Sequence, residues 1–196
     1  METIRAFVAI PLPPSLLDRL SILQRQLEKQ VPPQSVRWVR GEGIHLTLKF
    51  LGDTPVEKLP FIKRALAAEA QLVPPFSFTA AGLGCFPRSR RPRVIWVGVE
   101  EPLGRLATLQ SGIEEAMSGL GFKPEHRKFH PHLTLGRVQQ RVSRRDRERI
   151  GEVITAAPVE VLAEVPADRF ALIRSVLKPS GAEYTTLEEF TLGGGE

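Results

Sequence analysis

Cysteine is almost missing from this chain of 196 residues, which contains only Cys85. A single thiol excludes an internal disulfide, and so low a content is typical of proteins in the reducing cytoplasm. Long apolar runs are missing as well, since none approaches the roughly 20 residues that a membrane-spanning helix needs. The apolar start is short and soon interrupted by prolines, which argues against a signal peptide. We therefore expect a cytoplasmic protein that makes no membrane contact.

The rest of the composition is that of an ordinary globular protein. Hydrophobic residues make up 42% of the chain and charged residues 25%, and the length allows a substantial core. The formal net charge is +5 at pH 7. A basic balance of this kind favours a polyanionic partner.

One tetrapeptide occurs twice, as His45-Leu-Thr-Leu48 and His132-Leu-Thr-Leu135. Both copies lie in short apolar runs that are typical of strands. Alternate side chains of a strand share a face, so each histidine points to the same side as the threonine two residues later. The leucines then point into a core. The repetition predicts a duplicated fold that brings the two histidines together.

The order of the predicted elements repeats in the same way. Each half begins with an apolar strand and a helix and then reaches its His-Leu-Thr-Leu strand. We expect strands at 5–10, 44–51, 76–82, 94–99, 132–138, 159–165, 170–177 and 184–190, and helices at 14–30, 56–71, 102–120 and 143–156. This order predicts an α+β fold of two lobes related by a pseudo-twofold axis. We expect a single domain over 1–196, with repeat halves of about 1–85 and 93–196, joined by an exposed loop between the lobes.

Two histidines can supply a general base and a general acid near neutral pH, where imidazole is populated in both forms. The hydroxyl groups of Thr47 and Thr134 are suited to hydrogen-bond phosphate oxygens. Together these four side chains would cradle one tetrahedral anion. The reaction that fits is the opening of a phosphodiester, in which one histidine activates water and the other protonates the leaving oxygen.

A zinc site is the alternative use of histidine here, because His126, His130 and His132 are close in the sequence. Paired cysteines, the His-Glu-x-x-His pattern and a carboxylate at a diagnostic spacing are all missing. We expect His130 at the rim of a strand, His126 in a loop, and no metal site.

At these residues the sequence resembles the two-histidine (2H) phosphoesterase superfamily. Within it, the chain is similar to the bacterial and archaeal RNA 2′,3′-cyclic phosphodiesterases, also named 2′-5′ RNA ligases. The resemblance covers nearly the whole chain. Its matching segments are residues 5–10, Trp38, and residues 45–52, 92–98, 131–137 and 175–184.

The resemblance implies two antiparallel sheets that face each other across a central cleft, with the helices outside. It implies hydrolysis of a 2′,3′-cyclic phosphate to a 2′-phosphomonoester, with no metal or other cofactor. His45 would be the proton donor to the O3′ leaving group, and His132 the proton acceptor from water. The implied partner is RNA with 2′,3′-cyclic phosphate ends, including tRNA fragments or nucleotides. We expect the protein to act as a monomer.

Further residues are candidates for contacts with this substrate. The resemblance implies that Arg137 binds the phosphate, although a regular strand would point it away from the cleft unless a bulge or the strand's end re-aims it. Lys49 lies four residues after His45, so strand parity directs it into the cleft as a second phosphate ligand. Ser175 and Tyr184 are candidates for lining the nucleoside end, and the alternative for Tyr184 is that it caps the core.

The densest basic run of the chain is a candidate for contacts with the RNA backbone, with a solvated loop as the alternative. It consists of Arg88, Arg90, Arg91 and Arg93. Aromatic residues beside the motifs could stack on bases, but we expect them to pack in the core. These are Trp38, Phe50 and Phe129.

Two other functions stay open at this stage. An RNA ligase or tRNA-processing enzyme would use the same proton transfers in the reverse direction. A module that binds nucleotides or RNA without turnover would keep the cleft, although binding alone does not require two titratable groups.

Overall fold

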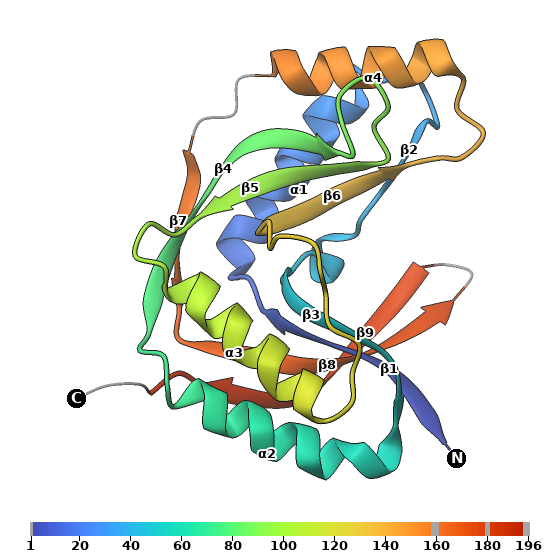
Figure 1. Cartoon of the computed structure of the whole chain (residues 1–196). Coiled ribbons are helices and arrows are strands. Elements are labelled where there is room, and N and C mark those ends of the chain that lie inside the picture. Colours follow the sequence, from blue (N-terminus) through green and yellow to red (C-terminus); the bar gives the residue numbers. More distant parts are fainter. Residues whose placement is uncertain (1, 158–160, 179–180, 194–196) are drawn as a thin grey trace.

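The computed structural model describes residues 2–157, 161–178 and 181–193. Figure 1 shows how its elements are arranged. In chain order they are β1 (Thr3–Ile10), α1 (Pro14–Glu28), β2 (Val36–Trp38), η1 (Gly41–Gly43), β3 (Leu46–Pro55), η2 (Val56–Lys58), α2 (Leu59–Ala70), β4 (Phe76–Phe86), β5 (Val94–Glu100), α3 (Arg105–Gly119), β6 (His132–Val138), α4 (Arg144–Ala156), β7 (Val161–Ala167), β8 (Arg169–Lys178) and β9 (Gly181–Thr191).

The strand order is symmetric about the centre of the sheet. The strands follow one another as β7-β4-β5-β6-β3-β1-β8-β9, with β2 also on β6, and all the pairings are antiparallel. We call β3-β1-β8-β9 the first lobe, and β6-β5-β4-β7 with β2 the second lobe. The two lobes meet edge to edge through the pair Leu46–Leu133 of β3 and β6. The prediction of an α+β fold with two antiparallel lobes is confirmed.

The helices cross between the halves of the chain. In the first lobe α2 contacts β9 and α3 contacts β3, whereas in the second lobe α1 contacts β7 and α4 contacts β4. Figure 1 shows α2 and α3 together against the first lobe, with α4 at the opposite end of the molecule. Since α1 belongs to the first half but packs on the second lobe, neither lobe is built from one continuous half.

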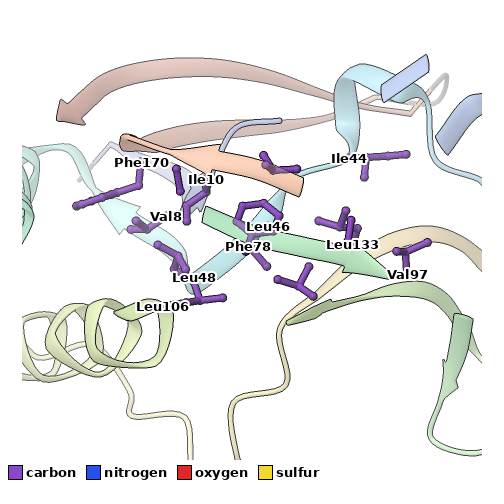
Figure 2. Packing of buried hydrophobic residues seen from close by; sticks show 14 of the residues in the cluster. Val8, Ile10, Ile44, Leu46, Leu48, Phe78, Val97, Leu106, Leu133 and Phe170 are labelled. Atoms are coloured by element: carbon purple, nitrogen blue, oxygen red, sulfur yellow. The ribbon is translucent and has the colours of Figure 1, made fainter. Parts of the chain in front are cut away.

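The core lies between the sheet and these helices. All four leucines of the repeated motifs are buried: Leu46, Leu48, Leu133 and Leu135. Figure 2 shows three of them packed in one cluster with side chains from β1, β4 and β5. The prediction that these leucines point into the core is confirmed. Their neighbours in the motifs therefore face the other side of the sheet.

The helix predicted at 56–71 begins later than expected. β3 continues to Pro55, which pairs with Thr3 at the start of β1. The short helix η2 follows, and α2 begins at Leu59. Pro60 then lies in the first turn of α2, where its missing N–H leaves no helical hydrogen bond unmade.

The arginine-rich loop does not connect the lobes, contrary to our expectation. β4 extends to Phe86, which pairs with Val94 of β5, and the Arg93 N–H donates to the Phe86 carbonyl at 2.7 Å. The loop therefore closes a hairpin within the second lobe, since antiparallel neighbours need only a short connection. The strand β2 was not predicted because three residues are too short a run for periodicity. The strand predicted at 159–165 begins outside the described residues, and β7 covers Val161–Ala167.

Candidate active site

The two repeated motifs lie on adjacent strands at the centre of the sheet. The leucine pair that joins the lobes is antiparallel. Carried one residue further on each side, this register sets His45 across from Thr134, and Thr47 across from His132. One residue pair thus brings both imidazoles and both hydroxyls to one face.

His45 is surrounded by aromatic side chains of the first lobe. Its ring stacks on Phe7, with centroids 4.6 Å apart and planes 25° apart, and Tyr184 meets it edge-on at 5.3 Å. Burial lowers the pKa of His45 to about 4, because an enclosed site disfavours the charged imidazolium. Without an anion beside it, His45 is therefore neutral at pH 7.

His132 has a fixed tautomer. Its Nδ1 lies 2.7 Å from the backbone carbonyl oxygen of His130. A carbonyl only accepts, so Nδ1 carries the proton and Nε2 keeps its lone pair in the neutral ring. Burial lowers the pKa of His132; the carbonyl bond opposes this, and the charges of His130 and Arg137 add to it. A neutral ring with a free Nε2 is suited to act as a general base.

A β-bulge turns Lys49 away from the histidines. On β3, Thr47 and Lys49 are two residues apart, but their partners on β1 are adjacent. Leu48 and Lys49 are consequently both buried, although they are consecutive residues of one strand. The parity that directed Lys49 into the cleft holds only for a regular strand.

The amine of Lys49 lies on the helix side of the sheet. Its Nζ donates to Glu114 Oε1 of α3 at 2.5 Å and to the backbone carbonyl of Lys123 at 3.2 Å. The Lys49 side chain is 3% exposed and that of Glu114 is 19% exposed. The prediction that Lys49 is a phosphate ligand in the cleft is therefore wrong. Its ion pair joins β3 to α3, and its hydrogen bond to Lys123 joins β3 to the loop that leads towards β6.

A second bulge turns Arg137 towards the site. On β6, Thr134 and Gly136 are two residues apart, whereas their partners Trp96 and Ile95 are adjacent on β5. The extra residue moves Arg137, which is exposed, to the face of Thr134. Its positive charge also lowers the pKa of His132. The β-bulge that the sequence analysis considered as a way to re-aim Arg137 is present.

The first bulge likewise exposes Phe50, which sequence reasoning had placed in the core. Phe50 is 67% exposed, and its ring centroid lies 6.0 Å from that of Phe7. It follows His45 by five residues, as Arg137 follows its own histidine. This correspondence is a signal for Phe50 in the sequence, in addition to its place beside the first motif. The other two aromatic residues pack against the core as expected: Trp38 and Phe129.

Ser175 and Tyr184 pair with each other across β8 and β9. Ser175 is buried and also pairs with Arg5 of β1. Tyr184 is 38% exposed and contacts the rings of Phe7 and His45. Tyr184 therefore lies beside His45, and its ring also covers Phe7 of the smaller buried cluster, as the alternative of a core cap predicts. Two residues of the matching tail, 179 and 180, lie outside the described residues.

The arginine run is exposed throughout its length, but its members differ in what they face. Arg91 and Arg93 line a pocket together with Arg137 and Arg147. Arg88 and Arg90 lie on the same hairpin loop and do not line this pocket.

The histidines around the start of β6 are not arranged as a metal site. Within the part of the chain that the structure describes, no group of three or more His, Cys, Asp or Glu side chains is placed to hold a metal ion. The rings of His130 and His132 have centroids 6.4 Å apart, and His126 is exposed in the loop before β6. Among the same described residues, no helix is long and apolar enough to cross a membrane.

Comparisons with known proteins find relatives that match nearly the whole chain. The Methanothermobacter thermautotrophicus protein named RNA 2′,3′-cyclic phosphodiesterase is 35% identical over 189 residues, covering 96% of this chain and 99% of its own. A crystal structure from Thermus thermophilus matches with a TM-score of 0.77 and 31% identity, over 98% of this chain and 100% of the other. Escherichia coli LigT in complex with 3′-AMP matches with a TM-score of 0.74 and 28% identity, over 97% and 99%.

The family comparison reproduces the internal duplication. The family model described as LigT like Phosphoesterase matches twice, at residues 10–96 and 97–184. Each match contains one His-Leu-Thr-Leu motif. Between them the two matches span most of the chain, which therefore belongs to the LigT-like phosphoesterase family.

Proposed function

We propose that this protein is an enzyme that hydrolyses 2′,3′-cyclic phosphodiester ends of RNA to 2′-phosphomonoesters without a metal ion. The observation that carries the proposal is the pairing of Leu46 of β3 with Leu133 of β6, because it puts the two His-x-Thr motifs on adjacent strands. The names of the relatives support the substrate class, since several are called RNA 2′,3′-cyclic phosphodiesterase. The LigT complex with 3′-AMP supports a nucleotide in this fold.

In the proposed reaction His132 is the base and His45 the acid. Nε2 of His132 takes a proton from water, whose oxygen attacks phosphorus. The bond from phosphorus to O3′ breaks, and the imidazolium of His45 gives its proton to O3′. The products are a 3′-hydroxyl group and a 2′-phosphomonoester. Thr47, Thr134 and the guanidinium of Arg137 stabilise the charge on the non-bridging oxygens.

The low pKa of His45 fits this role once substrate is bound. The free protein holds His45 neutral, because burial lowers its pKa to about 4. A cyclic phosphodiester brings one negative charge to the site. An opposite charge within about 4–6 Å favours the imidazolium and raises its pKa. The bound substrate would thus promote protonation of His45, which then donates this proton to O3′.

We place this activity in a single-domain monomer in the cytoplasm. The strands of the two lobes are interleaved along the chain, since the first lobe takes β1, β3, β8 and β9. Neither lobe is therefore a continuous segment that could fold as a separate unit. The single cysteine fits a reducing compartment.

Product analysis tests the proposal against its two alternatives. We expect an RNA with a 2′,3′-cyclic phosphate end to give the 2′-phosphomonoester in excess EDTA, at the same rate as without EDTA. Adding an RNA with a 5′-hydroxyl group should leave hydrolysis the main reaction. Joined RNA as the main product would favour the ligase, and binding without turnover would favour the non-catalytic module. Loss of activity in EDTA would contradict the metal-free mechanism.

A further inference from the structure

The hairpin loop and the end of β6 enclose a strongly basic pocket of about 600 Å³. We call it the arginine pocket. Four of its seven lining residues are arginines and none is acidic; the seven are Arg91, Arg93, Val94, Arg137, Val138, Gln140 and Arg147. In the part of the chain that the structure describes, the ion pairs do not include Arg91, Arg93 or Arg137. Several uncompensated cations around one cavity favour an anionic ligand.

The walls of the arginine pocket are held in place by Arg147 of α4. Its guanidinium donates to the carbonyl of Pro92 at 3.1 Å, and to those of Gln139 and Gln140 at 2.8 and 3.0 Å. One side chain thus joins the hairpin loop to the end of β6. The Val138 N–H also donates to the Arg93 carbonyl at 2.9 Å. Arg147 is a positioning residue, and the remaining guanidinium groups face a preformed cavity.

The hairpin loop also packs closely against α4. A Cβ atom built on Gly151 would clash with the Ser89 carbonyl oxygen, so glycine allows the helix to approach the loop this closely. The loop is therefore packed on α4 at Ser89. Its next residues carry the side chains that line the pocket.

The arginine pocket lies at the end of β6, whereas His132 lies at the start of the same strand. Arg137 is shared by both, because it lines the pocket and its charge reaches His132. Its Cα atom follows that of His132 by five residues, which is roughly 16 Å along the strand at about 3.3 Å per residue. The far side of the pocket, at Arg91 and Arg93, is beyond the single phosphodiester that the histidines would attack. A second anion would occupy it.

The chemistry of the substrate identifies that anion. An RNA strand that ends in a 2′,3′-cyclic phosphate has no phosphate beyond this end, so each of its other phosphates lies on the 5′ side. We infer that the arginine pocket binds the backbone phosphates on the 5′ side of the terminal nucleotide, and that the enzyme therefore prefers oligonucleotides to single nucleotides. Guanidinium groups suit this role because they bind phosphate oxygens in pairs. The inference rests on the proposed function.

The test compares two substrates in two double variants. The substrates are a trinucleotide with a 2′,3′-cyclic phosphate end and a nucleoside 2′,3′-cyclic phosphate, which has no 5′ phosphate. The variants are Arg91→Gln with Arg93→Gln, and a matched control, Arg144→Gln with Arg145→Gln. The control removes the same charge from the exposed start of α4, outside the pocket.

We expect the wild type to have the higher kcat/KM on the trinucleotide. In the pocket variant the ratio of kcat/KM between the two substrates should fall at least tenfold, as expected for the removal of charge-assisted hydrogen bonds. The salt dependence of trinucleotide binding should weaken by about 0.7 in log–log slope for each phosphate that the variant no longer binds. The control should keep the ratio within about twofold.

Three outcomes would overturn the inference: no substrate preference in the wild type, an equal loss on both substrates, or an equal effect of the control. Failure of the proposed function is seen separately. In that case the wild type would turn over neither substrate. Fluorescence anisotropy with a trinucleotide that ends in a 2′-phosphate would still report on the arginine pocket, because binding needs no turnover.

Discussion

Replacing His132 by alanine is expected to lower kcat by about 10²–10⁴-fold, the contribution of one positioned general base. His45→Ala should cause a loss of similar size, because departure of O3′ then lacks its proton donor. Both variants should still bind a nucleoside 2′-monophosphate, since the threonines and Arg137 are retained. Steady-state kinetics on a 2′,3′-cyclic phosphate and binding of that product measure the two effects independently.

His126→Ala is the matched control for these variants. His126 is exposed in the loop before β6, and the substitution removes an imidazole from the same half of the chain. We expect kcat to change by less than about twofold. Full activity in either His45→Ala or His132→Ala would contradict the proposed acid and base. A loss of folding in a variant would be visible in its thermal unfolding curve.

Replacing Lys49 by alanine is expected to destabilise the fold without acting on the substrate. The change leaves the carboxylate of Glu114, whose side chain is 19% exposed, without its cation. Breaking a buried ion pair from one side costs about 3 kcal/mol of unfolding free energy. For a domain of this size that corresponds to a fall of roughly 6–12 °C in Tm. Chemical denaturation and thermal unfolding both measure it.

Lys63 offers the matched control for Lys49. Its ion pair with Glu188 is exposed, with side-chain exposures of 35% and 41%, so Lys63→Ala should cost less than about 1 kcal/mol. The double change Lys49→Met with Glu114→Leu should recover much of the stability, because it removes both buried charges. An unchanged Tm with a raised KM in Lys49→Ala would instead place Lys49 in the cleft.

The two strands that carry the repeated motifs could be predicted from the sequence, because their side chains alternate with a strict period of two. Histidine and threonine alternate with leucine in both motifs, and Leu46 and Leu133 form the pair that joins the lobes. The alternation of polar residues with leucine also predicted that the leucines of both motifs lie in the core. The duplicated order of strands and helices predicted an α+β fold with two lobes for the same reason.

The residues that the sequence misplaced follow from single-residue bulges. One extra residue on β3 reverses the parity of the positions after it, so Lys49 is buried beneath the sheet and Phe50 is exposed. The same defect on β6 turns Arg137 to the histidine side. A bulge depends on the partner strand as well as on the bulged one. The sequence of one strand alone does not show where its parity changes.

The sequence did not predict which strands make up each lobe, and the reason is different. Local patterns show where strands begin and end, but not which sheet edge a strand joins. β4 belongs to the first half in sequence but pairs in the second lobe, while β8 and β9 of the second half pair in the first lobe. The expectation of a loop between the lobes failed because the strands before and after it pair with each other.

The pH dependence of turnover in excess EDTA tests the central claim most directly. The free enzyme needs His132 neutral and His45 protonated, and burial lowers the pKa of both, that of His45 to about 4. The account predicts a bell-shaped kcat/KM with its maximum below pH 6.5. The alkaline limb of kcat should lie at higher pH, because bound phosphate raises the pKa of His45. A flat profile across this range, or activity that EDTA abolishes, would contradict a pair of histidines acting as acid and base.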